Sequence, residues 1–405
     1  MTQYPVPYIS PSTRPGRIAV AVLWLVVALC LGRIATASGD YQWDFRVFHA
    51  APAALDSGSN PYDKMAQLAI PEHLSYLYPP IALHAFRPFS ALPFEIAYLC
   101  WFSFKLLALA LLLRLWHRHF EPLDSSVLVL AFLTFGFNAA ILRDMTAGNI
   151  AILEQLGLWT AFYLIVKGRS YSAAAIIALV AQFKLMPVVF LGLLPFVGPA
   201  RGWKPLLAGG GIFAGVFSLN FLLMPQMMSH YLESFGAVNP NLDERGEINP
   251  STLALLRDIV DVVSKSGVAT PPWLADAAFL IFVTGLAIVL LWALRKYATR
   301  IASMDPRWLI YIGCLLYVLT MPRVKDYTYM ILLIPALFAL RRVACGPVVP
   351  ALILLLFLPP ADSYVPGFGS FLPWLQSYVP WIAACCLLYF TIDWLAKSVP
   401  HDKRI

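Results

Sequence analysis

Residues 17–63 read RIAVAVLWLVVALCLGRIATASGDYQWDFRVFHAAPAALDSGSNPYD. Residues 17–37 form an apolar run as long as an α-helix must be to cross a bilayer. Directly after it come four aspartates, Asp40, Asp44, Asp56 and Asp63. Because a carboxylate beside hydrocarbon is energetically costly, we expect this acidic segment to have a function, and Asp44 is the first candidate.

The composition of the whole chain sets its class. Hydrophobic residues make up 60% of the sequence and charged residues 13%, and the mean hydropathy is +0.72, whereas soluble domains carry about 25% charged residues. The sequence therefore predicts an all-α polytopic membrane protein. The net charge of +7 does not indicate a nucleic-acid partner, because the basic residues fall in short clusters between apolar runs. The six cysteines show neither a disulfide framework nor metal-ligand spacing.

About twelve transmembrane segments are expected across a single domain, residues 1–405. Two of them are irregular, because Pro187 and Pro195 interrupt them, and the second is short enough to be a half-helix. The glycine pair Gly211 and Gly215 in a later segment predicts close helix packing. The expected segments are roughly 17–37, 93–117, 125–143, 148–167, 171–187, 188–199, 203–224, 275–298, 307–322, 327–342, 346–361 and 378–396.

The distribution of Lys and Arg orients these segments. With both termini in the cytoplasm, every short loop on the cytoplasmic side is basic, as the positive-inside rule requires. The long segments 38–92 and 225–272 then lie outside, and the protein is expected in a bacterial inner or plasma membrane. Residues 17–37 also imitate a signal peptide ending in Ala35-Thr36-Ala37, although Arg33 interrupts that pattern. Either way, Asp44 is extracytoplasmic.

Each outer segment has its own expected structure. In the first, residues 46–55, 64–69 and 81–89 are expected to form interfacial helices, with Phe45, Val47, Phe48 and Leu55 available to face lipid. In the second, a turn-rich stretch precedes a helix that Ser251 caps and that runs through Val263. This segment is either a mobile lid hinged near Gly236 and Gly246 or a static cover over the site.

Further polar residues are expected at the same membrane surface. Asp40 and Asp44 are four residues apart and would share one face of a helix. Lys184 stands in an apolar context and needs an anion, whereas Glu154 is expected to make a polar contact between helices. The other candidates are Tyr78, Asn149, Arg257, Arg323, Lys325, Asp326 and Tyr327.

Several motifs resemble one family of membrane enzymes. They are DFRVFHAA from Asp44, GSNPYD at residues 58–63, YPP at 78–80 and LPFEIAYLCW at 92–101, with weaker matches AGN at 147–149, FKLMP at 183–187, NPST at 249–252 and MPRVKDY at 321–327. This pattern resembles glycosyltransferase family 87, the DUF2029 group, which includes mycobacterial phosphatidylinositol-mannoside mannosyltransferases. Two departures are Asn149, where the family usually has Gln, and residues 325–327, where relatives often show Trp and His.

The resemblance implies a GT-C fold with an extracytoplasmic active site. It implies transfer of a sugar, with mannose as the expected one, from a polyprenyl-phosphate donor to a lipid-linked or glycan acceptor. The family's catalytic base corresponds to Asp44. Lys184, Arg257, Arg323 and Lys325 are then expected to bind the donor phosphate, and Tyr78, Asn149, Asp326 and Tyr327 to contact substrate.

A single base suffices if the reaction inverts the anomeric centre, because the phosphate is already a good leaving group. A retaining mechanism would need a second carboxylate as nucleophile, for which Asp40 is the candidate. The favoured alternative is that Asp40 supports the catalytic base from behind or caps the loop. No cofactor is expected. This chemistry requires no metal, although the acidic loops leave a bound metal ion open as an alternative. The rival functions are a transporter or flippase of lipid-linked glycans, for which the sequence shows no internal repeat, and a non-catalytic assembly subunit.

Overall fold

The computed structural model describes residues 14–36, 41–63, 76–123, 126–236, 244–297, 301, 305–342, 353, 355–356 and 371–397. Within these ranges the chain is helical, apart from turns and one isolated bridge between Gly246 and Asn249. Asp40, residues 64–69 and most of the expected segment 346–361 lie outside them.

Five of the described helices are long and apolar enough to cross a membrane: Pro15–Thr36, Phe94–His119, Val127–Ala147, Trp203–Leu223 and Leu274–Lys296. Four shorter apolar helices accompany them: Ala151–Val166, Ser170–Val180, Arg307–Thr320 and Val379–Leu395. Large apolar side chains such as Leu222 and Ile281 are mostly exposed, which suits contact with lipid tails. The prediction of an all-α polytopic membrane protein is therefore confirmed.

The chain divides into two compact units. Residues 18–123 and 141–242 form one, called here the amino-terminal unit, and residues 1–17, 124–140 and 243–405 form the other, the carboxy-terminal unit. The boundary falls inside helix α5 (Val127–Ala147), where the backbone leaves helical geometry from Gly136 to Ala139. Phe137, Asn138 and Ala139 all have positive φ angles there, so α5 consists of two helices, one in each unit.

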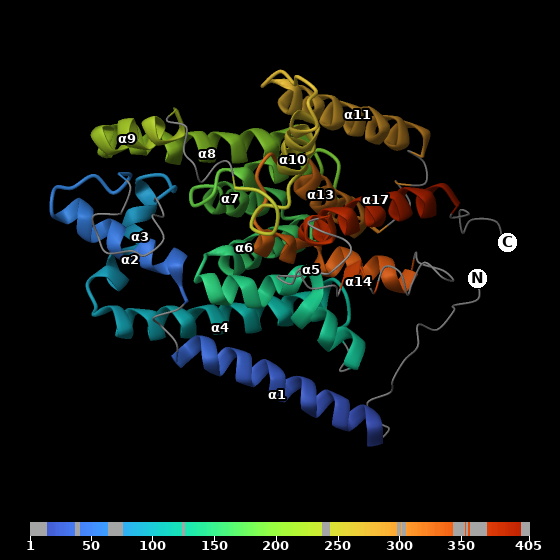
Figure 1. Cartoon of the computed structure of the whole chain (residues 1–405), viewed down its shortest axis with the longest axis horizontal. Helices are drawn as coiled ribbons and strands as arrows, with labels where there is room; N and C mark the ends of the chain where they lie inside the picture. Colours follow the sequence, from blue (N-terminus) through green and yellow to red (C-terminus); the bar gives the residue numbers. More distant parts are fainter. Residues whose placement is uncertain are drawn as a thin grey trace. The chain divides into compact units, whose positions relative to one another are not determined.

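The amino-terminal unit contains a row of packed helices, α4 (Phe94–His119), α6 (Ala151–Val166), α7 (Ser170–Val180) and α8 (Trp203–Leu223), in which each helix packs against the next (Figure 1). The 3₁₀ helix η2 (Met186–Leu193) packs against α7 and α8 and takes the place of the expected half-helix at 188–199. Helix α1 (Arg14–Thr36) precedes this row in the chain, and α9 (Pro225–Gly236) follows it.

A glycine brings α7 and α8 together, but it is not one of the pair expected from the sequence. A Cβ atom on Gly209 would lie 3.0 Å from the Cβ of Ala174 and 2.6 Å from Leu191. Gly211 and Gly215 instead have open space where their Cβ atoms would be. The prediction that Gly211 and Gly215 make a close packing contact is therefore wrong for the described residues.

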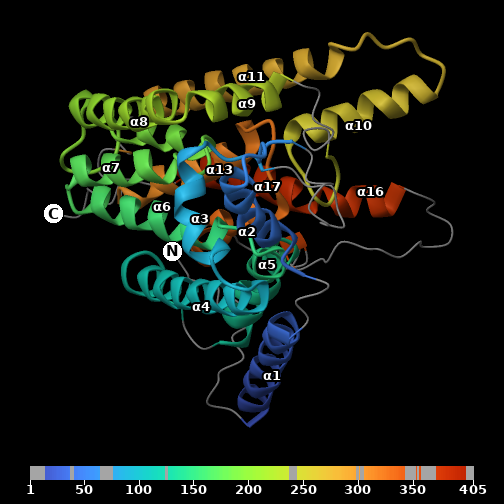
Figure 2. The same ribbon diagram turned by 90° about the vertical axis from the view of Figure 1, so that its left-hand side faces the viewer.

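Helices α2 (Trp43–Asp56) and α3 (Ile81–Ser90) pack side by side and against α4 (Figure 2). The Phe45 ring stacks on Trp101 with a centroid distance of 5.4 Å, and the Phe48 ring stacks on Phe86 at 4.5 Å. Phe45, Val47 and Phe48 are all buried within the protein. The expectation that they face lipid is wrong, because aromatic side chains of α3 and α4 cover this face of α2.

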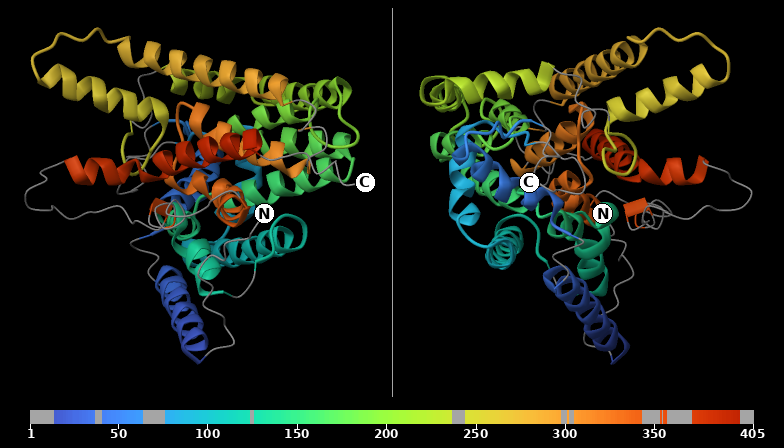
Figure 3. Two further views of the ribbon diagram at one scale, coloured as in Figure 1. Left: turned by 90° about the vertical axis from the view of Figure 1, so that its right-hand side faces the viewer. Right: turned by 60° about the vertical axis from the view of Figure 1, so that its left-hand side comes forward.

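In the carboxy-terminal unit, α10 (Thr252–Lys265) and α11 (Leu274–Lys296) form a helical hairpin (Figure 3). The Ser251 side chain accepts a hydrogen bond of 3.3 Å from Ala254 N, so the predicted cap of α10 is confirmed. The rest comprises α13 (Arg307–Thr320), the 3₁₀ helix η4 (Asp326–Leu332), α14 (Leu333–Arg342), α16 (Phe371–Ser377) and α17 (Val379–Lys397). Helices α13, α14 and α17 pack together, and every residue from Tyr327 to Leu340 is buried.

Candidate functional site

Four of the expected site residues meet in the amino-terminal unit. Asp44 lies in the first turn of α2, Tyr78 just before α3, Asn149 in the turn between α5 and α6, and Lys184 between α7 and η2. Asn149 Nδ2 donates a hydrogen bond of 2.7 Å to Asp44 Oδ2 and lies 3.3 Å from the Tyr78 hydroxyl. Lys184 Nζ donates a hydrogen bond of 3.0 Å to Asn149 Oδ1. We call these four residues the Asp44 cluster.

Lys184 fixes the orientation of the Asn149 amide. An ammonium group only donates hydrogen bonds, so the amide oxygen must face Lys184 and the amide nitrogen must face Asp44. The nitrogen in turn donates to Asp44, which suits an ionised carboxylate that only accepts. The hydrogen bonds of the cluster therefore all point the same way: Lys184 donates to Asn149, and Asn149 donates to Asp44.

Glu154 completes this arrangement. Its Oε2 atom lies 3.1 Å from Lys184 Nζ, and the Glu154 side chain is buried while that of Lys184 is 22% exposed. The expected polar contact of Glu154 between helices is thus an ion pair with a site residue. Sequence reasoning missed this partner, although a lysine in an apolar segment signalled that some anion had to be near it.

A second ion pair supports the turn that carries Asn149. Lys105 Nζ lies 2.8 Å from Asp144 Oδ2 and donates to the Asp144 carbonyl oxygen, and both side chains are buried. Asp144 Oδ1 also accepts a hydrogen bond of 3.2 Å from Ala151 N, at the start of α6. The pair therefore ties α4 to both ends of the turn. It was not predicted, although a lone lysine within an apolar helix is itself a signal of a buried partner.

Gly148 allows the start of α2 to approach this turn. Its φ angle is +70°, and a Cβ atom there would lie 2.3 Å from Gln42 Oε1 and 2.8 Å from Phe45 Cβ. Gln42 N donates to Thr146 O at 2.8 Å, and the buried Trp101 Nε1 donates to Gly148 O at 2.9 Å. Because these contacts flank Asp44 and Asn149 in the chain, a glycine at position 148 is needed to bring the two side chains together.

A group of tyrosines holds Tyr78 beside the cluster. The Tyr62 hydroxyl donates a hydrogen bond of 2.9 Å to the carbonyl oxygen of Tyr78, and the Tyr62 ring lies against Tyr76 and Tyr231. Burial, and then the neighbouring Tyr231, raises the pKa of Tyr62 well above its ordinary value. Tyr62 therefore stays neutral and keeps its proton for this bond at physiological pH.

The carboxy-terminal unit holds the other candidates that the structure describes. Arg323 Nη2 lies 2.8 Å from Glu244 Oε2, and Lys325 Nζ contacts the same oxygen. Asp326 accepts a hydrogen bond of 2.8 Å from the backbone N–H of Tyr327 at the start of η4. Arg257 instead pairs with Asp276 of α11 at 3.2 Å, where both side chains are partly exposed.

Several contacts tie residues 246–258 to other parts of the carboxy-terminal unit. Gly246 N donates to the Tyr378 hydroxyl at 3.2 Å, and that hydroxyl donates to Asp258 Oδ2 at 2.6 Å. Ser251 Oγ donates to Pro322 O at 2.8 Å, and Thr252 Oγ1 donates to Leu319 O at 2.7 Å. These bonds hold residues 244–252 against Leu319, Pro322 and Tyr378 of the same unit. The choice between a mobile lid and a static cover stays a prediction. The expected hinge near Gly236 adjoins residues 237–243, which lie outside the described ranges.

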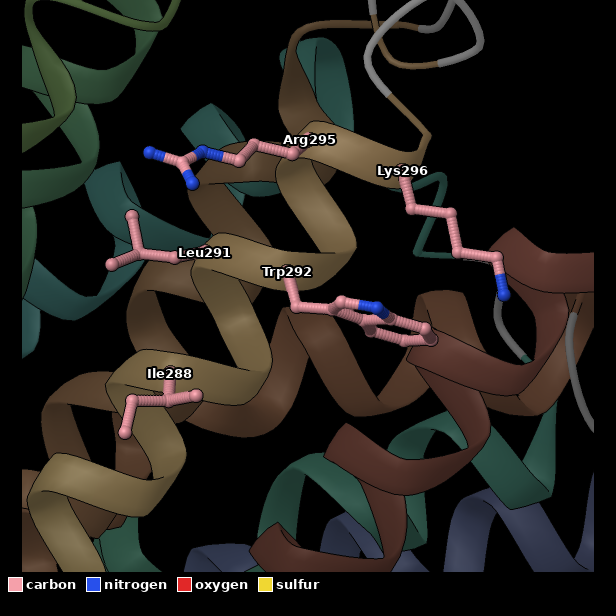
Figure 4. Close-up of a pocket in the computed structure, with 5 residues that line it drawn as sticks. All are labelled: Ile288, Leu291, Trp292, Arg295 and Lys296. Carbon is pink, nitrogen blue, oxygen red and sulfur yellow. The ribbon is translucent and has the colours of Figure 1, made fainter.

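A pocket on the surface of α11 is not a candidate active site. Figure 4 shows its lining side chains, Ile288, Leu291, Trp292, Arg295 and Lys296. Lys296 Nζ lies 4.4 Å from the centroid of the Trp292 ring, as expected for a basic side chain at the end of an apolar helix. This lining contains neither a carboxylate nor a hydroxyl to act as a base. In the described part of the chain, no group of three His, Cys, Asp or Glu residues could hold a metal ion.

Comparison with known proteins identifies the family to which the chain belongs. The model of glycosyltransferase family 87 matches residues 76–322, which is more than half of the chain. The match includes Tyr78, Asn149 and Lys184, while Asp44 precedes it. A search of curated proteins found no match. The chain belongs to glycosyltransferase family 87 and is a membrane glycosyltransferase.

Proposed function

We propose that this enzyme transfers a sugar from a polyprenyl-phosphate donor to a lipid-linked or glycan acceptor on the extracytoplasmic face of the membrane, with Asp44 as the general base. Mannose is the first candidate sugar. The observation that carries the proposal is the hydrogen bond of 2.7 Å from the Asn149 amide to the Asp44 carboxylate, with Lys184 orienting the amide.

The chemistry needs one carboxylate with an available charge. The base takes the proton of an acceptor hydroxyl as the oxygen attacks the anomeric carbon, and the phosphate leaves with the electrons of the breaking C–O bond. Because no covalent sugar–enzyme intermediate forms, the anomeric centre inverts and a second carboxylate is not required.

Asp44 suits this role better than the two neighbouring carboxylates. Glu154 and Asp144 are buried, and each forms an ion pair with a lysine. Asp44 is only half-buried and is held by a neutral amide, so an acceptor hydroxyl can reach a carboxylate whose position is already fixed.

The finer architecture belongs to the same proposal. We expect the described helices to be part of a GT-C fold with about twelve transmembrane segments. The Lys184 ammonium orients Asn149 and is also proposed to face the donor phosphate, where an ammonium group is a favourable partner. Asp40 lies outside the described residues, and its role stays a prediction.

The test is sugar transfer by the purified chain in lipid nanodiscs, with a polyprenyl-phosphate sugar as donor. Asp44→Asn removes the base at unchanged size and should lower kcat by about 10² to 10⁴. Asp56→Asn is the matched control, because Asp56 ends the same helix and forms an exposed pair with Arg87. Full transfer by Asp44→Asn, or an equal loss in Asp56→Asn, would contradict the proposal.

A further inference from the structure

Two cations of the carboxy-terminal unit converge on a single carboxylate oxygen. Arg323 Nη2 lies 2.8 Å from Glu244 Oε2, and Lys325 Nζ contacts that same atom. The three side chains are between 18% and 25% exposed. They are therefore partly shielded from water. Charge interactions are stronger in such a position than at an open surface, and a ligand can still reach the three side chains.

The carboxylate satisfies only part of what the cations offer. Among the described residues, Arg323 and Lys325 both pair with Glu244 and contact the same oxygen of it. Arg323 Nε is also buried and has no hydrogen-bond partner among the described residues. Arg245, the neighbour of Glu244 in the chain, pairs with Asp258 and Asp261 instead. In the ion pairs of the described residues, two cations thus share one carboxylate, and Arg323 Nε is a donor that these residues leave unused.

A phosphate group matches this site better than a carboxylate does. It presents several acceptor oxygens, so Arg323 and Lys325 could each bond to a different oxygen, and Arg323 Nε could be satisfied as well. With Glu244 bound, Arg323 and Lys325 must instead share one oxygen atom, Oε2. The donors of Arg323 and Lys325 are thus arranged as in an anion-binding site, and the Glu244 carboxylate does not use all of them.

The backbone around the site is already fixed. Asn249 Oδ1 accepts a hydrogen bond of 2.8 Å from Val324 N, between the two cations, and Asn249 Nδ2 donates at 2.8 Å to the carbonyl oxygen of Glu244. Asn249 therefore links the backbone of residues 323–325, which carry the two cations, to the backbone of Glu244. Because these bonds involve the backbone of Glu244 and not its carboxylate, the carboxylate can leave the cations without breaking them, and the donors stay arranged for an incoming anion.

We propose that Arg323 and Lys325 form a phosphate-binding site that the Glu244 side chain occupies as an internal counter-anion, and that a phosphate group displaces Glu244 when it binds. The source of the phosphate, a polyprenyl phosphate, rests on the proposed function. Recognition of the phosphate group itself does not, since inorganic phosphate carries the same chemistry.

The experiment is equilibrium binding to the full-length protein in nanodiscs of zwitterionic lipid, with two probes, inorganic phosphate and a polyprenyl monophosphate. Glu244→Gln keeps the side-chain shape but removes the competing charge. It should tighten phosphate binding about tenfold, the change expected if Glu244 occupies the site about nine-tenths of the time. Asp261→Asn removes a charge from a different arginine pair of the same unit and should leave both affinities unchanged.

Two more variants test whether Arg323 binds the phosphate and whether Glu244 competes with it. Arg323→Gln should weaken binding at least tenfold in both the native and the Glu244→Gln background. If Glu244→Gln does not fold, Glu244→Asp withdraws the carboxylate by one methylene and should also tighten binding. Tightening for both probes supports a general phosphate site, and tightening for the polyprenyl probe alone supports a lipid-specific one.

Unchanged or weaker binding in the Glu244 variants would overturn the proposal, as would equal tightening in Asp261→Asn. Because these measurements need no turnover, they are separate from the proposed function. If the chain uses a different donor, the transfer assay fails while inorganic phosphate still binds more tightly to Glu244→Gln.

Discussion

Gly148→Ala tests how the site is assembled. The φ angle of +70° at Gly148 costs an alanine about 1–2 kcal/mol. The new methyl group would also lie 2.3 Å from Gln42 Oε1 and 2.8 Å from Phe45 Cβ, and such overpacking costs about 1–3 kcal/mol. The free energy of unfolding should therefore fall by about 2–5 kcal/mol. Because the start of α2 must move away, kcat should fall about 100-fold.

Gly58→Ala is the control for this variant. Gly58 has a similar φ angle of +78°, but apart from its chain neighbours nothing lies within 4 Å of the position of its Cβ. Alanine there should cost only the backbone term of about 1–2 kcal/mol and should leave kcat unchanged. Thermal unfolding and initial transfer rates measure both quantities. If Gly148→Ala behaves like Gly58→Ala, the close approach of Gln42 and Phe45 to the turn is not what positions Asp44.

Three further predictions follow from the ion pairs and the topology. Lys184→Met should lower kcat about tenfold or more because the Asn149 amide loses its fixed orientation, and an unchanged kcat would show that Lys184 does not act on Asp44. Lys105→Met should lower the free energy of unfolding by about 3–5 kcal/mol because it leaves Asp144 as an unpaired buried charge, and the double variant with Asp144→Leu should recover much of it; absence of recovery would contradict the pairing. A reporter fused after Arg201 should be cytoplasmic and one near Gly246 extracytoplasmic, and the reverse result would refute the predicted orientation.

The long helices were predictable because hydrophobic length alone defines them. The expected segments 17–37, 93–117, 203–224 and 275–298 agree with α1, α4, α8 and α11 to within a few residues. The short irregular piece at 188–199 is instead a 3₁₀ helix. Proline spacing showed that this piece is interrupted but did not indicate which backbone geometry replaces a regular helix.

The burial of α2 was not predictable in the same way. Lipid tails and the interior of a protein are both apolar, so the sequence of α2 cannot tell which of them Phe45 and Phe48 face. Similarly, Asp44, Asn149 and Lys184 were each found as candidates because polar residues in an apolar chain are costly. Their pairing, and the ion pairs with Glu154 and Asp144, depend on contacts between distant segments that a single sequence does not contain.

The central claim is that Asp44 performs the chemical step, and a single-turnover experiment tests it most directly. Enzyme saturated with a polyprenyl-phosphate sugar is mixed with acceptor, and the rate of transfer is measured alongside the dissociation constant of the donor. For Asp44→Asn we expect the transfer rate to fall by about 10² to 10⁴ while the donor dissociation constant stays within about twofold of the native value, because a general base does not bind the donor phosphate. An unchanged transfer rate, or a loss confined to donor affinity, would contradict the assignment of Asp44 as the base.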